Sequence, residues 1–314
     1  MCKHFTTAGM ILSLVILSGG CKEDDSFRAD NPTVEKVSFT ADDYKEIDED
    51  TLPTRTSVRN NTEFFWAQGD TVGIYPDTGA QVYFVMEDGA GASSAKFDGG
   101  GWALKQSAEY YSYYPFIGDI YLNRHRIPVS YVGQKQTGLT GVDHIGAYDY
   151  MYTDATFSES GNLNFNYHHL GCIIRPKLTL PAGTYTKLAI TAPSEVFVKS
   201  GWFDLQPLEN SVSVNGTKFS NQITIDLDGV SVDGSTTFLV YVMSAPVNLK
   251  GTEITISVLN DQKKEYQCKK TPSANYTAGR IGGLTCSSWT EVPQSMGMII
   301  DGWDDGGNLG GDAE

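Results

Sequence analysis

Short runs of β-branched and aromatic residues recur along most of this chain. The first block of them comprises residues 56–58, 64–66, 72–75, 81–86 and 110–116. Gly, Asp and Pro residues separate the runs at a spacing of about 8–12 residues, which is typical of β-sandwiches. A helix needs an apolar period of about 3.6 residues, and no stretch longer than about ten residues keeps one. The sequence therefore predicts an all-β fold with little helix.

A second block of such runs begins near residue 163. Its expected strands include residues 169–175, 187–191, 223–227 and 254–259. A chain of this length can form two domains that each bury a core. We expect two tandem β-sandwich domains, residues 33–160 and 161–291. A Gly-rich, acidic tail follows them at residues 292–314.

The N-terminal residues have the features of an export signal. Lys3 and His4 precede an apolar run at residues 10–17, and small residues follow it. This run is shorter than the about 20 apolar residues of a membrane-spanning helix. We expect a signal peptide at residues 1–20.

Cys21 directly follows the small residues and resembles the modified cysteine of a bacterial lipobox, although Ser18 stands where an aliphatic residue is usual. We predict lipidation of Cys21 and a linker at residues 21–32. The alternative is a cleaved signal followed by an ordinary free cysteine. The Lys-Glu-Asp-Asp sequence at residues 22–25 is similar to a signal that sends some outer-membrane lipoproteins to the cell exterior. The expected location is therefore the outer membrane, at the cell surface.

The charge balance excludes some partners. Lys and Arg number 23 against 38 Asp and Glu, which gives a formal net charge of −15. Nucleic acid binding requires a clustered positive field, so we expect no nucleic acid partner. An acidic chain is also repelled by an anionic bilayer. Membrane attachment would therefore come from the lipid on Cys21.

Cys2 would leave with the signal peptide. The remaining cysteines, Cys172, Cys268 and Cys286, are too few and too widely spaced for a disulfide framework. Cys268 and Cys286 could form one bridge in an oxidising compartment. Alternatively, all three are lone buried thiols that pack as small apolar side chains. The sequence leaves both alternatives open.

No motif points to catalysis, a cofactor or a metal. His168 and His169 are adjacent on an expected strand, so their side chains point to opposite faces and cannot hold one ion together. The chain has no metalloprotease, nucleophile-elbow or phosphate-loop motif. Trp102, Trp202 and Tyr111 could stack on sugars, or could fill the cores. We predict that the protein is not an enzyme and has no cofactor.

Several short motifs occur together in a characteristic order. They are Thr-Arg-Thr-Ser at 54–57, Trp-Ala-Gln-Gly-Asp at 66–70, Tyr-Tyr-Pro-Phe at 113–116, Tyr-Asp-Tyr-Met-Tyr at 148–152, His-Leu-Gly-Cys at 169–172 and Ala-Gly-Arg-Ile at 278–281. With the lipobox, this order resembles the fimbrillin family, the lipoprotein-derived subunits of type V pili and their anchor and tip relatives. The resemblance covers residues 34–284.

The resemblance implies two transthyretin-like β-sandwiches and assembly by strand donation. In that family an arginine-specific protease removes the segment around the first strand, and a strand of the next subunit enters the groove. Such exchange has a physical basis, because an incomplete sheet offers unpaired backbone groups and apolar pockets.

Carried over to this sequence, the displaced strand covers residues 34–44 and includes Val34, Val37 and Phe39. The cut would follow Arg55 or, as a less favoured site, Arg59. Alternatively, Arg55 is the first solvent-facing residue of a strand. A donor strand would lie near residues 288–300, where Pro293 and Gly297 interrupt the alternation and argue against a shaft subunit.

We therefore predict a fimbrillin-like surface lipoprotein, which is a structural, anchor or tip subunit of a pilus and mediates adhesion. Its expected partners are other fimbrial subunits, the outer membrane through the lipid on Cys21, and host or bacterial surface ligands. The alternative is a carbohydrate-binding surface lipoprotein that acts alone.

Overall fold

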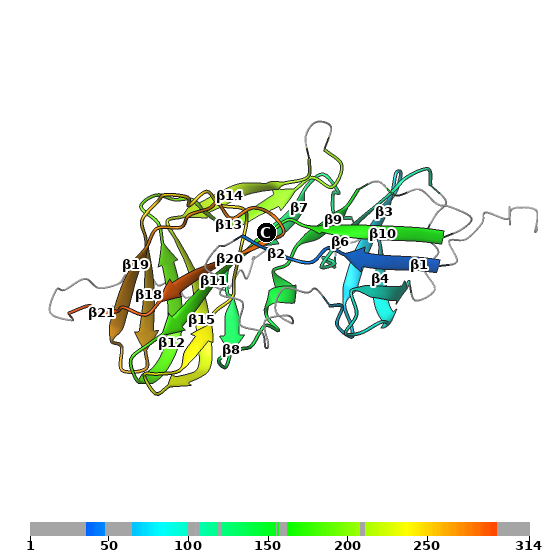
Figure 1. The fold of residues 1–314 in the computed structure, drawn as a ribbon. Helices are drawn as coiled ribbons and strands as arrows, with labels where there is room; N and C mark the ends of the chain where they lie inside the picture. The colour runs from blue at the N-terminus through cyan, green and yellow to red at the C-terminus, as the bar shows by residue number, and fades with distance from the viewer. Residues whose placement is uncertain are drawn as a thin grey trace, which may run out of the picture. The chain divides into compact units, whose positions relative to one another are not determined.

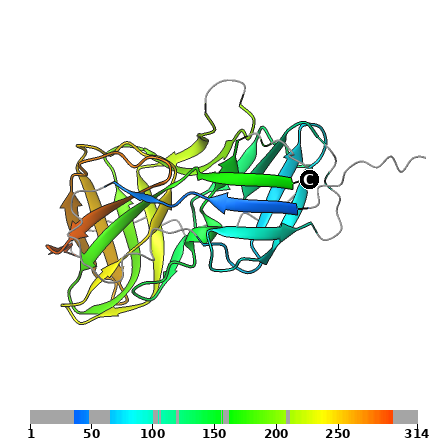
Figure 2. The same ribbon diagram turned by 45° about the vertical axis from the view of Figure 1, so that its right-hand side comes forward.

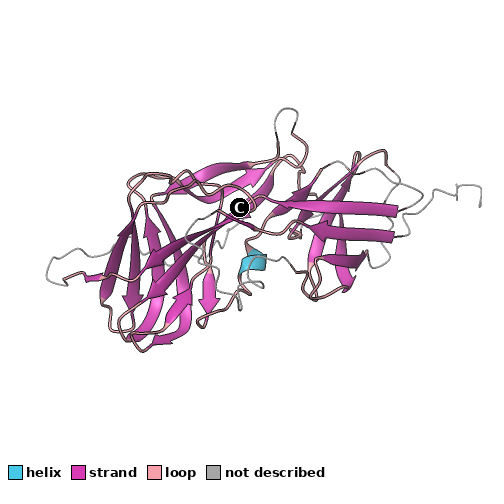
Figure 3. Cartoon of the chain, viewed as in Figure 1, coloured by secondary structure: helices cyan, strands magenta, loops and turns pink. Residues whose placement is uncertain are grey.

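The computed structural model describes residues 36–47, 65–99, 104, 107–118, 121–154, 156, 162–207 and 211–293. The signal peptide, Cys21, Val34, Arg55, Arg59, Trp102 and most of the acidic tail lie outside these residues. The regular secondary structure of the described residues consists of β-strands and one short 3₁₀ turn, η3 at Ile145–Ala147 (cyan in Figure 3). This confirms the predicted all-β class. Within the described residues, no helix has the length and apolar character needed to cross a membrane.

Seven strands close a barrel in the order β1-β10-β9-β6-β3-β4-β5. Their bounds are β1 Lys36–Ala41, β3 Thr71–Pro76, β4 Val82–Asp88, β5 Ser94–Asp98, β6 Tyr110–Tyr114, β9 Met151–Thr153 and β10 Asn162–His169. Inward-facing residues alternate with outward-facing ones, as strand geometry requires. Aromatic rings fill the interior, and Trp66, which is 1% exposed, packs edge-on against Phe97 at 5.0 Å between ring centroids.

The other strands form three further sheets (Figure 1). The first has the strand order β16-β11-β20-β2, and β17 also pairs with β11. Its strands are β2 Lys45–Glu46, β11 Cys172–Thr179, β16 Thr237–Leu239, β17 Val242–Ser244 and β20 Arg280–Cys286. The next has the order β21-β19-β18-β12-β15-β8: β8 Lys135–Thr137, β12 Gly183–Thr191, β15 Gln222–Val232, β18 Ile254–Asn260, β19 Glu265–Lys270 and β21 Thr290–Glu291. The third has the order β14-β13-β7: β7 Ile127–Ser130, β13 Phe197–Phe203 and β14 Val214–Ser220.

A continuous apolar core lies among these three sheets. Leu188 and Ile190 on β12 and Ile256 on β18 are fully buried in it, each 0% exposed. Fully burying a side chain of this size stabilises the fold by about 1.5–3 kcal/mol before the entropy of folding is counted. The alternating strands of the sequence thus form a layered apolar interior.

Strand pairing crosses the expected boundary between residues 160 and 161. The barrel strand β10 follows this boundary in sequence, yet it pairs with β1 and β9. Conversely, β7 and β8 precede the boundary and pair with β13 and β15. The division into two tandem transthyretin-like domains stays a prediction.

Candidate functional site

The first described part of the chain, residues 36–47, joins two of the sheets. We call it the first-strand segment; it consists of β1, three connecting residues, β2 and Ile47. Within the barrel, β1 runs parallel to β10 and antiparallel to β5, so that Phe39 lies opposite Phe165 on one side and Ala95 on the other. Figures 1 and 2 both show β1, in blue, beside the green β10. The segment is therefore paired on both sides in the barrel.

The end of the segment pairs with the sheet that contains β20. There β2 runs parallel to β20, and the amides of Lys45 and Ile47 donate to the carbonyls of Gly279 and Ile281 at 2.9 and 2.8 Å. All the strands that bind this segment come from distant parts of the sequence. We call the place it occupies the first-strand groove.

The side chains of β1 alternate between the barrel interior and the solvent, and this alternation determines how β1 fills its part of the groove. Val37 and Phe39 point inward and are 5% and 0% exposed. The Phe39 ring stacks on Phe165 at 5.3 Å and meets Phe97 edge-on at 4.4 Å. Outward-facing Thr40 donates to the side chain of Asn166 at 3.0 Å. The apolar part of the groove is therefore a cleft lined by aromatic rings.

The connecting residues end in a buried polar cluster formed by Tyr44, Asp149 and His169. Tyr44 Oη donates to Asp149 Oδ1 at 2.7 Å, and the same oxygen lies 2.8 Å from His169 Nδ1. The ring of Tyr44 stacks on that of His169 with 3.9 Å between centroids. His169 Nε2 lies 2.6 Å from the carbonyl oxygen of Asp42. Both ring nitrogens of His169 thus face acceptors, as expected for a protonated imidazole.

The electrostatics of the cluster favour a buried ion pair. Burial alone would lower the pKa of His169, but the charge and hydrogen bond of Asp149, together with the Asp42 carbonyl, raise this pKa above its ordinary value. Burial, followed by the charge of Asp149, raises the pKa of Tyr44 well above its ordinary value, so its phenol remains a donor. The side chains of Asp149 and His169 are each only 1% exposed. Buried charges of this kind are costly unless they are paired and hydrogen-bonded.

A second ion pair holds β2. Arg175 on β11 donates one hydrogen bond to Glu46, from Nη2 to Oε2 at 2.9 Å. Its Nη1 lies 2.8 Å from Glu46 Oε1, which is a contact between opposite charges without hydrogen-bond geometry. The Arg175 side chain is 7% exposed and that of Glu46 is 29% exposed. A hydrogen bond between two charged groups is stronger than one between neutral groups. The first-strand segment is therefore held by apolar contacts in β1 and, in residues 42–46, by contacts with the buried side chains of Asp149, His169 and Arg175.

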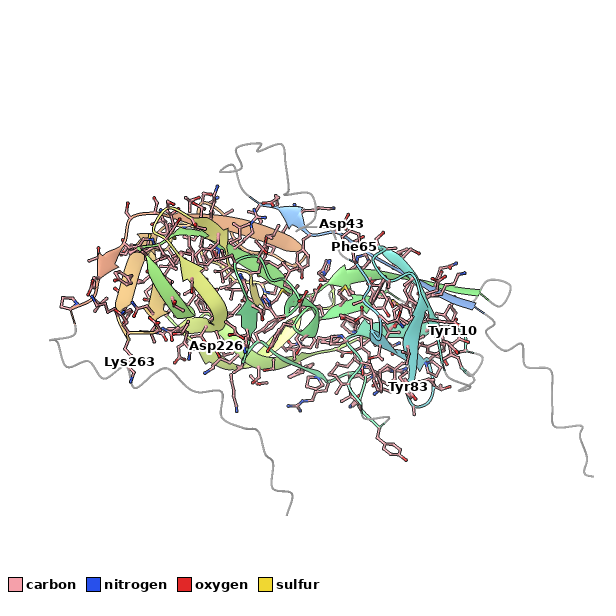
Figure 4. The ribbon with its side chains drawn as sticks, turned by 90° about the horizontal axis from the view of Figure 1, so that it is seen from below. Asp43, Phe65, Tyr83, Tyr110, Asp226 and Lys263 are labelled. Atoms are coloured by element: carbon pink, nitrogen blue, oxygen red, sulfur yellow. The ribbon has the colours of Figure 1, made fainter. Side chains whose placement is uncertain are left out.

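The two histidines behave as their adjacency predicts. His169 is buried in the polar cluster, whereas His168 is half-buried and contacts Asp42 Oδ2 at 2.8 Å. Asp43, which is labelled in Figure 4, stands between Asp42 and Tyr44 in the sequence and is exposed. Among the described residues, no group of three His, Cys, Asp or Glu side chains could hold a metal ion.

Of the residues predicted for the displaced strand, Val37 and Phe39 lie in the groove, whereas Val34 lies outside the described residues. The predicted processing site Arg55 and the predicted lipidation site Cys21 also lie outside them. Sequence reasoning missed the importance of Asp149, Arg175 and Glu46. The available signal was a charged residue inside an apolar run: Asp149 stands among tyrosines, and Arg175 lies in the strand that begins at Cys172.

The structure also describes the candidate cysteines and two of the three aromatic residues that were considered for sugar binding. Cys172, Cys268 and Cys286 are buried free thiols, which corresponds to the lone-thiol alternative. Tyr111 is buried in the core and accepts a hydrogen bond from Gln206 at 2.8 Å. Trp202 is half-buried, and the guanidinium of Arg126 lies 5.7 Å from its ring centroid.

No protein-family model matches the chain, and no curated protein matches its sequence. Solved structures do match it. A "putative cell adhesion protein" from Bacteroides uniformis is 12% identical, with a TM-score of 0.51 over 82% of this chain and 96% of that one. Another from Bacteroides ovatus is 13% identical, with a TM-score of 0.49 over 82% and 96%. The tip fimbrial protein Mfa3 from Porphyromonas gingivalis is 10% identical, with a TM-score of 0.36 over 71% and 91%. The Bacteroides uniformis match establishes a similar fold.

Proposed function

We propose that this protein is a fimbrillin-like surface lipoprotein, a structural, anchor or tip subunit of a pilus, that joins its neighbours by strand donation. The observation that carries the proposal is the first-strand groove. One short segment near the N-terminus completes the barrel through β1 and borders a second sheet through β2. If that segment leaves, the backbone groups of β10, β5 and β20 lose their partners, and a strand from another molecule can satisfy them.

Three further observations support this proposal. The order of the sequence motifs resembles the fimbrillin family. The fold is similar to that of a Bacteroides uniformis protein named for cell adhesion. In addition, Arg55 follows the first-strand segment in the sequence, where a cut would separate the segment from the rest of the chain.

The proposed location is the outer cell surface, with lipid on Cys21 as the membrane anchor until any processing after Arg55. Proposed partners are other pilus subunits and, for an exposed subunit, ligands on host or bacterial surfaces. A shaft subunit would release the first-strand segment. An anchor would keep both the segment and its lipid.

Strand exchange is tested by cutting the chain after the first-strand segment. A site-specific protease sequence is placed within residues 48–64 of the mature chain, and the cut protein is mixed with an excess of labelled peptide of residues 34–48. We expect the label to enter the protein while its circular dichroism and cooperative melting are retained. Lack of incorporation, or incorporation only on unfolding, would contradict strand donation.

Carbohydrate binding by a protein that acts alone is the alternative, and Trp202 is its described candidate. A glycan microarray with the uncut protein tests it. Binding that is lost in Trp202→Ala, combined with failure of the strand exchange, would favour the alternative. Strand exchange without such binding would favour assembly.

A further inference from the structure

We propose that three side chains, those of Gln134, Gln136 and His144, take the place of a neighbouring strand along residues 239–243 and keep this sheet edge from pairing with the same edge of a second copy of the chain. The inference concerns a different edge from the first-strand groove and goes beyond the proposed strand exchange. It identifies an edge that the protein keeps closed, the side chains that close it, and the partner that they exclude.

Residues 239–243 lie at an outer edge of the sheet that contains β11. Both β16 and β17 pair antiparallel with β11. Between these two strands, the amide of Val240 donates to the carbonyl of Pro176 on β11 at 2.9 Å. Successive residues of an antiparallel strand direct their backbone groups to alternate sides, so those of residues 239, 241 and 243 point away from β11. Among the described residues, no strand pairs with them on that side.

Two side-chain amides bind the backbone along this edge. Gln134 accepts from the amide of Met243 and donates to its carbonyl, both at 2.7 Å. Gln136 accepts from the amide of Tyr241 at 3.0 Å and donates to the carbonyl of Leu239 at 2.8 Å. A glutamine amide carries the same donor and acceptor as a peptide group, and residues two apart in an extended chain point to the same face. The two glutamines therefore make the hydrogen bonds that a neighbouring strand would make.

His144 completes the row of contacts, because its Nε2 lies 2.8 Å from the carbonyl oxygen of Tyr241. That oxygen can only accept, so Nε2 carries the proton. Burial lowers the pKa of His144, which favours the neutral ring, and the neutral ring still has this donor. The glutamines are themselves buried, with Gln134 1% and Gln136 0% exposed. The edge is therefore closed to water as well as to other strands.

The side chains that close the edge come from a different sheet. Gln136 lies on β8, which is an outer strand of the six-stranded sheet and runs parallel to β15. The amide of Gln134 also donates to the carbonyl of Tyr131 at 3.0 Å, which fixes its orientation. The glutamines thus join the outer edges of two sheets and close one side of the layered core.

Residues 238–243 have the composition of a strand that associates readily. Their sequence is Phe-Leu-Val-Tyr-Val-Met, with no charge, no Pro and no Gly. An uncovered edge strand of this kind is a template for pairing with another chain. At the opposite edge of the same sheet, β2 has only two residues, and both are charged. Short and charged edge strands resist such pairing, so the 239–243 edge is the one that depends on cover.

The favoured partner of an uncovered 239–243 edge is the same edge of a second copy. Two identical strands related by a two-fold axis are antiparallel, so the donors of each meet the acceptors of the other. The segment carries no charge that would oppose a copy of itself. Removing the glutamine amides should therefore allow two copies to pair.

Amide exchange in single variants tests the contacts. Gln134→Met keeps the length and the apolar stem of the side chain but removes its amide. In the uncut chain, we expect the exchange rate of the Met243 amide to rise about tenfold, while that of the Tyr241 amide changes by less than about twofold. Gln136→Met should give the reverse. Hydrogen exchange followed by NMR measures both rates.

Gln267→Met is the matched control. Gln267 is half-buried on β19, and its side chain donates to the carboxylate of Glu265 at 2.8 Å and not to the edge. Both exchange rates should stay within about twofold of the parent values in this variant. Unchanged rates in the Gln134 and Gln136 variants, or equal changes of both amides in each, would overturn the contacts assigned to the two glutamines.

The double variant Gln134→Met/Gln136→Met tests what the contacts exclude. In sedimentation equilibrium of the uncut chain, its average mass should rise with concentration toward about twice that of the parent protein. The Tyr241 and Met243 amides should regain protection over the same concentration range, because a second copy then covers them. A folded variant with exposed amides that keeps the mass of the parent at every concentration would overturn the proposal.

If the double variant does not melt cooperatively, the two single variants are measured in its place, since each leaves one glutamine amide intact. They should associate in the same way but more weakly. A folded single variant that has an exposed amide and does not associate would equally overturn the proposal. Neither measurement uses the cut protein, so the outcome is independent of the test of strand exchange.

Discussion

The two halves of the first-strand segment are held in different ways. In β1, Val37 and Phe39 enter an aromatic interior, and the backbone pairs on both sides. In residues 42–46, the contacts are an ion-paired histidine cluster and a guanidinium–carboxylate pair. Apolar burial is strong but tolerant of sequence, because many side chains of similar volume can fill such a cleft. Buried charge demands a particular partner at a particular place. The comparison indicates that β1 supplies most of the free energy of binding and residues 42–46 supply most of its specificity.

The largest expected effect belongs to the apolar half. Phe39→Ala should lower the free energy of unfolding by about 3–5 kcal/mol, because it removes a fully buried ring from the barrel core. Urea denaturation measures the change. The matched control is Thr40→Ala on the outward face of the same strand, where we expect less than about 1 kcal/mol. Similar effects of the two substitutions would show that β1 is not seated in the barrel as described.

The next effect tests the polar half. Asp149→Ala should cost about 3 kcal/mol, because it leaves the buried imidazole of His169 without its counter-charge. The control is Asp154→Ala, whose carboxylate is 82% exposed and lies 3.6 Å from His168. We expect its effect to be below about 1 kcal/mol. Equal stabilities of the two variants would mean that the Asp149–His169 pair does not help to hold the fold.

The sequence predicts β1 better than it predicts the contacts of residues 42–46. The alternation of Val37 and Phe39 predicts a strand, and the all-β class follows from many such local patterns. Pairing partners are not encoded locally, however: β1 lies against β10, whose residues come more than a hundred positions later, as in Val37 opposite Leu163. For the same reason, the order of strands in the sequence did not predict that β7 and β8 pair with β13 and β15.

The polar cluster was harder still to predict. Tyr44, Asp149 and His169 are brought together from three separated segments, and each has an ordinary explanation in its local context. A sequence shows that His169 is next to His168, and strand geometry then separates their faces. It does not show which carboxylate the inward-facing ring will meet. Specific polar contacts depend on the tertiary arrangement, whereas strand class depends on local pattern.

The pH dependence of stability provides a second test of the polar half. The pKa of His169 is raised in the fold, so its contribution to stability is fully present below the unfolded-state pKa of about 6.5 and is lost as the pH rises through the folded-state pKa. The stability difference between the parent protein and His169→Gln should therefore be largest in mildly acidic solution and should shrink as the pH rises above about 6.5. Denaturation across this range measures it. A difference that grows with pH would mean that His169 is neutral in the fold.

The smallest effect separates the hydroxyl of Tyr44 from its ring. Tyr44→Phe should lower the free energy of unfolding by about 1–2 kcal/mol, because the stacked ring remains while Asp149 loses one hydrogen bond. Tyr44→Leu, which also removes the aromatic stacking on His169, should cost more in the same urea titration. If the phenylalanine variant were as stable as the parent, the donor at this position would be dispensable, and residues 42–46 would be held by ring packing and by the Arg175–Glu46 pair. The relative sizes of these two changes therefore measure how much of the stabilisation by Tyr44 comes from its hydroxyl group and how much from its ring.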